Sequence, residues 1–178
     1  MLRVERYRAG VAVSYDDYAP RAAERVEDGE KALMALDSGV VTEAFENVVE
    51  ANTLLSGLGF LNTGLATAHG IHSGLTVLPE THKYLHGEKV AFGIVCQMVL
   101  ENTPAETVDK VMRFMVAIGL PVTLADLGVA AERDKVLAIA EKTANGPLIH
   151  QEPFAVTTER VYGAIIAADA LGRKYKGL

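Results

Sequence analysis

The stretch EKVAFGIVCQMVL, residues 88–100, decides the fold class of this 178-residue sequence. Apolar side chains occupy most faces of the helix that it predicts, with few polar positions to turn toward water. A helix that is hydrophobic all round normally lies at the centre of an α-helical domain. We therefore expect this segment to be buried in a helical core.

Helical patterns continue on both sides of this segment. Apolar residues recur at helical spacing over residues 21–36, 42–56, 65–75, 104–118, 131–145 and 158–176. Start signals are Thr42, the capping box Thr103-Pro-Ala-Glu106, and Thr157 or Thr158, while Gly39 closes an early helix. No convincing strand follows residue 20. We predict an all-α fold, a helical bundle of seven to eight helices.

The composition excludes several classes of function. Seventeen basic and 23 acidic residues give a net charge of −6, which argues against nucleic acid or an anionic membrane surface as a partner. No stretch approaches the roughly 18 apolar residues of a membrane span, and the N-terminus lacks the apolar core of a signal peptide. The single cysteine, Cys96, indicates a reducing compartment and is expected to be a buried thiol. We expect a cytoplasmic protein.

Four of the five histidines, His69, His72, His82 and His86, lie between residues 69 and 86. Neutral imidazole is a common ligand of zinc and other first-row metals. His69 and His72 are three residues apart and share a helix face, and His82 and His86 can do the same if their segment is helical. The spacing does not match a metalloprotease HExxH motif. From this pattern alone the histidines are either metal ligands or ordinary polar residues at helix edges.

Other catalytic motifs are absent from the sequence. It contains neither GxGxxG nor GxxxxGK[ST], the glycine-rich loops that bind phosphates, and no GxSxG nucleophile elbow. Three glycines within residues 57–64 are expected to form a tight connection between helices.

A set of motifs around the histidines resembles a known family. SGLGF (56–60), GLATAHGIHSG (64–74) and HKYLHGEKVAFG (82–93) are similar to glycerol dehydrogenases, which belong to the iron- or zinc-dependent polyol and alcohol dehydrogenases. The resemblance extends over residues 29–176. It implies the fold of the C-terminal helical half of those enzymes, whose N-terminal half is a Rossmann-like domain that binds NAD. We therefore divide the chain into a poorly matched segment, 1–28, and a helical metal-binding domain, 29–178.

The resemblance also implies roles for single residues. His69 and His86 match the two histidines that bind the divalent metal, usually zinc, and Phe60 matches a residue that lines the glycerol pocket. His72 is expected either beside the metal ligands, without binding the metal itself, or in the wall of the pocket. The family's third ligand is an aspartate in a Gly-Asp-Ala motif that this sequence lacks, and the context of Asp16 and Asp17 does not match it.

These implications lead to three hypotheses about function. In the first, the chain is the metal-binding half of a truncated or split enzyme that oxidises glycerol or a similar polyol, with NAD bound only by a partner domain. In the second, it is a non-catalytic helical remnant that acts as an oligomerising or interaction domain. The third, activity of the chain alone, is disfavoured because no nicotinamide site is recognisable. All three predict a homo-oligomer or a bound nucleotide-binding chain, because a half-enzyme exposes apolar surface.

Overall fold

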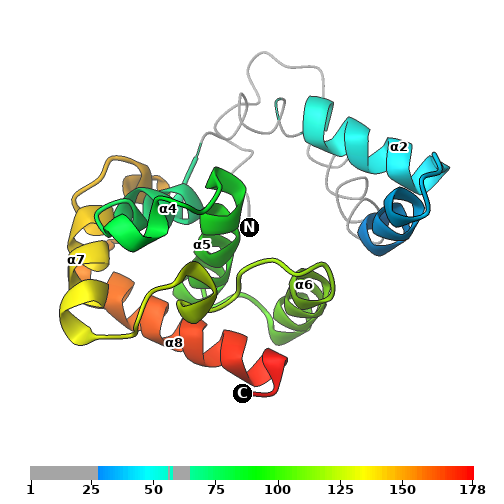
Figure 1. The fold of residues 1–178 in the computed structure, drawn as a ribbon. Coiled ribbons are helices and arrows are strands. Elements are labelled where there is room, and N and C mark those ends of the chain that lie inside the picture. The colour runs from blue at the N-terminus through cyan, green and yellow to red at the C-terminus, as the bar shows by residue number, and fades with distance from the viewer. Residues whose placement is uncertain (1–27, 56, 58–64) are drawn as a thin grey trace, which may run out of the picture. The chain divides into compact units, whose positions relative to one another are not determined.

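A computed structural model describes residues 28–55, 57 and 65–178 of the chain (Figure 1). They fall into two compact units, one that ends at Gly64 and one from Leu65 to Leu178, and each is described by itself. The described residues form six labelled α-helices, a further helix over 28–37 and no strand, so the all-α prediction is confirmed. Within these same ranges, no helix is long and apolar enough to cross a membrane.

In the described part of the first unit, two short α-helices are connected through Gly39, and a π-helical turn follows the second. The helix over residues 28–37 ends where Gly39 adopts a φ of 67°, which is the left-handed conformation that glycine tolerates best. Helix α2, Glu43–Glu50, begins as predicted, because the Thr42 hydroxyl accepts a hydrogen bond from the Phe45 amide. A π-helical turn, Ala51–Leu55, follows α2. The expected connection over 57–64 lies outside the described residues, apart from residue 57.

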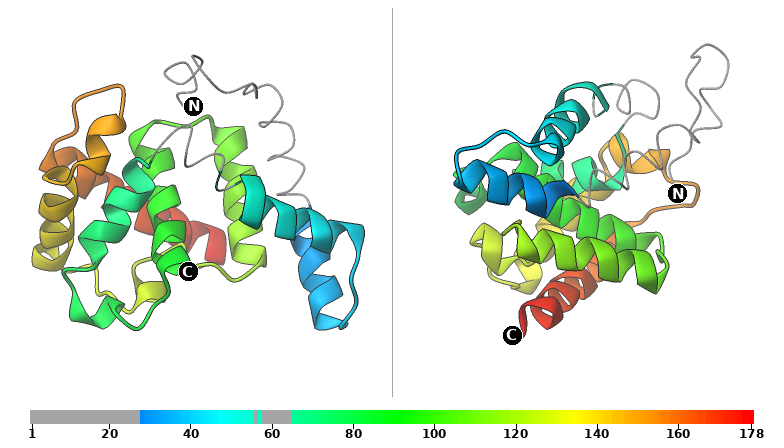
Figure 2. Two further views of the ribbon diagram at one scale, coloured as in Figure 1. Left: turned by 90° about the horizontal axis from the view of Figure 1, so that it is seen from above. Right: turned by 90° about the vertical axis from the view of Figure 1, so that its right-hand side faces the viewer.

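The second unit consists of five α-helices: α4 (Thr67–Leu75), α5 (His86–Leu100), α6 (Ala105–Ala117), α7 (Arg133–Ala144) and α8 (Thr158–Lys176). Three 3₁₀ turns, Pro79–Thr81, Ala125–Leu127 and Leu148–Gln151, lie in the connections. Helices α4, α6 and α8 contact α5, and α7 packs against both α4 and α8 (Figure 2). Helix α5 is therefore the central element of this unit, as its sequence predicts.

Burial along α5 agrees with this central position. Phe92, Val95 and Cys96 are completely buried, and they contact a core contributed by the surrounding helices and turns. One side of α5 still faces water, because the side chain of Ile94 is 40% exposed. The largest buried partners in this core are Ile71, Leu75, Met112, Leu124, Leu127, Ile139, Ile149 and Ile165.

Two glycines allow helices to approach other backbone segments very closely. A Cβ atom on Gly93 of α5 would lie 2.3 Å from the carbonyl oxygen of Ala68 in α4. A Cβ atom on Gly172 of α8 would lie 1.9 Å from the carbonyl oxygen of Val122. Atoms in a packed interior cannot approach this closely, so both contacts require glycine. The first of these contacts sets the separation of α4 and α5.

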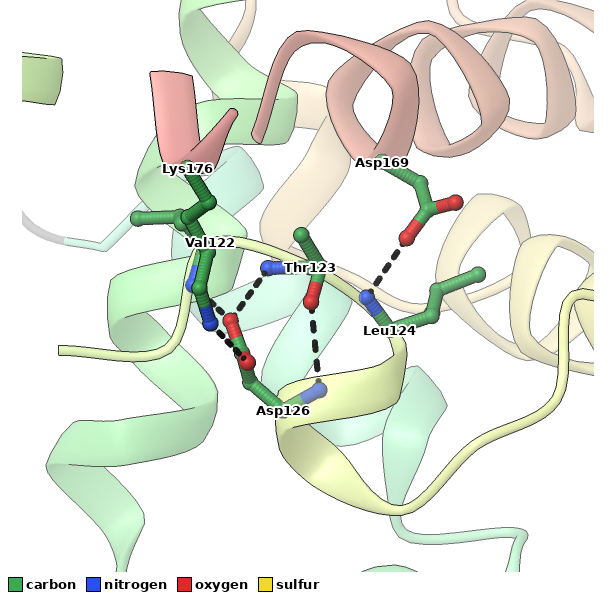
Figure 3. Close-up of polar contacts among 6 residues, drawn as sticks. All are labelled: Val122, Thr123, Leu124, Asp126, Asp169 and Lys176. Carbon is green, nitrogen blue, oxygen red and sulfur yellow. Dashed lines mark hydrogen bonds and ion pairs between the residues drawn. The ribbon is translucent and has the colours of Figure 1, made fainter. Parts of the chain in front are cut away.

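The segment before the second 3₁₀ turn is fixed by two carboxylates (Figure 3). Asp126 accepts hydrogen bonds from the backbone amides of Val122 and Thr123, and the Thr123 hydroxyl accepts one from the Asp126 amide. Buried Asp169 of α8 accepts the Leu124 amide at 2.8 Å. These bonds satisfy buried backbone donors and attach the segment to α8.

The prediction of a capping box at the start of α6 is wrong. Helix α6 begins at Ala105, and Pro104 occupies the N-cap position with φ −52° and ψ 138°. No side chain caps this helix. The extended ψ of Pro104 places Thr103 one residue too early to cap it.

Candidate metal centre

Three of the clustered histidines come together between α4 and α5. The rings of His69 and His86 have their centroids 5.3 Å apart, and those of His72 and His86 are 4.4 Å apart. His86 Nδ1 lies 3.2 Å from His72 Nε2, which is hydrogen-bond distance. His69 and His72 are half-buried, whereas His86 is exposed. The structure thus brings together both predicted metal ligands and His72.

The fourth histidine of the cluster has a different environment. His82 Nε2 is 3.0 Å from the carbonyl oxygen of Thr76, in the connection between α4 and α5. The same connection is fixed by the buried Thr81 hydroxyl, which donates to the carbonyl of Leu75 or Leu78. This arrangement gives His82 a role in shaping the turn that leads to His86.

Local bonds fix the first residue of α5. The Glu88 carboxylate accepts a hydrogen bond from the Leu85 amide at 2.6 Å, just before the helix begins. Leu85 itself is extended, with φ −66° and ψ 159°. His86 therefore occupies the first helical position, from which its side chain meets α4.

The first turn of α4 is held by side chains from other elements. Its own N-cap residue, Ala66, provides no side-chain bond. Instead, Gln97 of α5 accepts the Ala68 amide at 3.0 Å, and the buried Thr67 hydroxyl donates to Glu152. The bond to Gln97 satisfies a backbone donor that a helix start leaves open, and both contacts position the turn that carries His69. Neither Gln97 nor Glu152 was expected from the sequence, because their partners lie far along the chain.

The electrostatic environment favours the neutral forms of His69 and His72. Burial lowers the pKa of His69, and the positive form of His86 lowers it further. The pKa of His72 is lowered by burial first, and then by His86, Lys89 and His69. A neutral imidazole offers the lone pair that a metal binds. When His86 Nδ1 carries the proton shared with His72, His86 Nε2 keeps its lone pair for another partner.

The donor set fits a borderline metal such as zinc but is incomplete. Imidazole nitrogens suit zinc, which takes four ligands in most protein sites. Across residues 28–55, 57 and 65–178, no group of three or more His, Cys, Asp or Glu side chains has the geometry to hold a metal ion. Further ligands would therefore have to come from elsewhere. The predicted pocket residue Phe60, as well as Asp16 and Asp17, lie outside the described residues.

Comparison with known proteins shows extensive similarity over this region, although no family model matches the chain. It is 53% identical over 150 residues to a glycerol dehydrogenase of Citrobacter freundii, a match that covers 83% of this chain and 41% of the relative. A match to the enzyme of Pseudomonas putida is 49% identical over 152 residues and covers 84% and 42% of the two chains. The chain therefore spans about two fifths of the length of these curated relatives.

Solved structures agree with these matches. The crystal structure of glycerol dehydrogenase from Schizosaccharomyces pombe superimposes with a TM-score of 0.85 at 39% identity, covering 96% of this chain and 45% of that one. A probable glycerol dehydrogenase from Sinorhizobium meliloti gives a TM-score of 0.82 at 44% identity, with 90% and 47% covered. The fold and the sequence therefore indicate similarity to the same kind of protein, the glycerol dehydrogenases.

Proposed function

We propose that this chain, a homologue of the glycerol dehydrogenases over most of its length, forms the helical metal-binding part of a polyol dehydrogenase. The observation that supports this most strongly is the convergence of His69, His72 and His86 from two helices. The proposed domain is residues 29–178, and the proposed metal is zinc or another divalent ion. The proposed substrate is glycerol or a similar polyol, and the proposed compartment is the cytoplasm.

In this proposal His69 and His86 are the metal ligands. His72 orients the His86 ring through the Nδ1–Nε2 hydrogen bond, because the second nitrogen of a ligand histidine is usually held by a neighbour. Phe60 is proposed to line the substrate pocket. When bound, the metal would supply Lewis acidity toward a substrate hydroxyl. The chain's own contribution is to favour the neutral forms of His69 and His72 and to hold the three rings in a fixed geometry.

Oxidation of glycerol to dihydroxyacetone also needs a nicotinamide cofactor to accept the hydride. The 178 residues contain no glycine-rich phosphate loop of the kinds considered above. We propose that NAD and the missing metal ligand are bound by protein outside these residues, in the same polypeptide or in a separate chain. Exposed apolar side chains such as Met34 and Val41, 62% and 70% exposed, are consistent with an oligomer or a partner.

The same exposed residues also favour a second candidate function. A non-catalytic helical remnant that serves as an interaction domain would need apolar surface but no metal. The two candidates differ in whether the histidines bind zinc.

Calorimetric titration of the purified chain with zinc tests the proposal. We expect one zinc ion per chain, bound more weakly than at a site with all its ligands, and we expect His86→Ala and His69→Ala each to abolish this binding. His82→Ala is the matched control, because its ring bonds to Thr76 instead of joining the cluster, and it should leave zinc binding unchanged. Absence of binding, or binding that is indifferent to His86, would favour the non-catalytic remnant.

A further inference from the structure

Lys89 is a buried cation beside the histidine cluster. Its side chain belongs to α5 and is only 7% exposed. It lies three residues after His86, so the two residues share one face of the helix. Its charge also acts on His72, whose pKa it lowers. The Lys89 backbone amide donates to the Leu85 carbonyl, but in the part of the chain that the structure describes the Lys89 ammonium forms no hydrogen bond or ion pair.

A buried ammonium without a counter-ion is unfavourable. It has three N–H donors and no acceptor, and buried polar groups are normally hydrogen-bonded. The nearest carboxylate in sequence, Glu88, is already bonded to the Leu85 amide. A divalent metal on His69 and His86 would add two more positive charges nearby. An anion close to Lys89 would offset this positive charge, and among the described residues no carboxylate forms an ion pair with it.

We propose that Lys89 receives a carboxylate beside the His69–His72–His86 cluster. A neutral polyol hydroxyl could accept a hydrogen bond but would leave the buried charge uncompensated. A carboxylate has two oxygens, so it can pair with the ammonium and still bind a neighbouring imidazole or a metal. Its source is either the protein, as the ligand that completes the metal site, or a bound acid. This proposal rests on the proposed function in one respect, because it takes the histidine cluster to be the metal site.

Metal-free binding of acetate tests this subsite. The histidine ring C–H resonances of the purified chain are followed by NMR as acetate is added at constant pH and ionic strength. We expect a saturable shift of His72 and His86 that weakens at least tenfold in Lys89→Met and is retained in Lys89→Arg. Lys83→Met is the matched control, because Lys83 is exposed and lies over the ring of Tyr84. No saturable shift in the wild type, or an equal shift in Lys89→Met, would overturn the proposal.

The thermal unfolding temperature shows whether the Lys89→Met variant is folded as stably as the wild type. Replacing an unpaired buried charge by an apolar side chain of similar length should preserve the fold. Lys89→Met is therefore expected to unfold at or above the wild-type temperature. If it unfolds below that temperature, the acetate comparison rests on Lys89→Gln, and unchanged acetate binding by this variant would equally refute the proposal.

Zinc titrations with and without acetate distinguish the two sources of the carboxylate. If the carboxylate completes the metal site, acetate tightens zinc binding in the wild type but not in Lys89→Met, because coupling between two ligands is reciprocal. If it belongs to a bound acid, acetate binds without changing the affinity for zinc. Both outcomes support the subsite. Zinc binding that fails while acetate still binds would refute the proposed metal function alone.

Discussion

Gly93→Ala should both destabilise the protein and weaken metal binding. The new Cβ would lie 2.3 Å from the Ala68 carbonyl oxygen and 2.9 Å from its carbonyl carbon, where ordinary contacts begin at 3.4 Å. The opposing atoms belong to backbone, so relief requires α4 and α5 to separate by roughly 1 Å at their closest point. Overpacking of this kind costs about 1–3 kcal/mol, and we expect the upper part of that range. Better helix propensity of alanine offsets about 1 kcal/mol of the loss.

The free energy of unfolding should therefore fall by about 1–2 kcal/mol. Since each kcal/mol corresponds to about 4 °C, the melting temperature should fall by about 4–8 °C. Since His69 directly follows Ala68, the same displacement moves it away from His86, and zinc affinity should fall about tenfold or more. Differential scanning calorimetry and zinc titration measure the two effects. Gly163→Ala in α8 is the matched control, because no atom lies within 4 Å of its Cβ position. This control should raise the free energy of unfolding by up to about 1 kcal/mol. A Gly93→Ala protein as stable as the control, with unchanged zinc affinity, would show that the Gly93–Ala68 contact does not set the position of His69.

Three further predictions concern the helical core. Gly172→Ala would place a Cβ atom 1.9 Å from the Val122 carbonyl oxygen. We expect the free energy of unfolding, measured with urea, to fall by about 2–3 kcal/mol. Burial, followed by the charge of Asp169, raises the pKa of Cys96, so at pH 8 a thiol reagent should modify it only as fast as the protein unfolds. Burial alone would raise the pKa of Asp126, but bonds from Lys176, Val122 and Thr123 outweigh this and hold it below its usual range. Its stabilising effect is therefore full above about pH 4 and is lost as the pH falls through the folded-state pKa. Asp126→Asn should lower the urea midpoint at pH 7, and a gap from wild type that does not narrow below pH 4 would contradict this sign.

Much of the fold could be predicted from local signals. The apolar segment of α5 predicted its central position, and Thr42 and Thr157 cap the helices that they were expected to begin. Such signals depend on residues within one turn of each other, which a sequence displays directly. The capping box at Thr103 is wrong because the backbone angles of Pro104, not the residue types, decide where α6 begins.

The candidate site could be predicted only in part. The spacing of His69 and His72 indicated a shared face, and the resemblance singled out His86. The spacing of residues does not reveal the tertiary contacts that shape the site. The Gly93–Ala68 contact, the Gln97 bond to the Ala68 amide and the burial of Lys89 all depend on how α4 meets α5 or on what covers α5. A polar residue on a mostly apolar helix was the only sequence signal for Lys89.

Anomalous diffraction at the zinc absorption edge, from crystals of the zinc-loaded chain, would locate the metal relative to His69 and His86. We expect one strong peak between α4 and α5, at about 2.0–2.1 Å from a ring nitrogen of both His69 and His86. His72 should remain hydrogen-bonded to His86 without contacting the metal. A peak bound to other residues, or no peak at this site in zinc-loaded crystals, would show that His69 and His86 do not form a metal site.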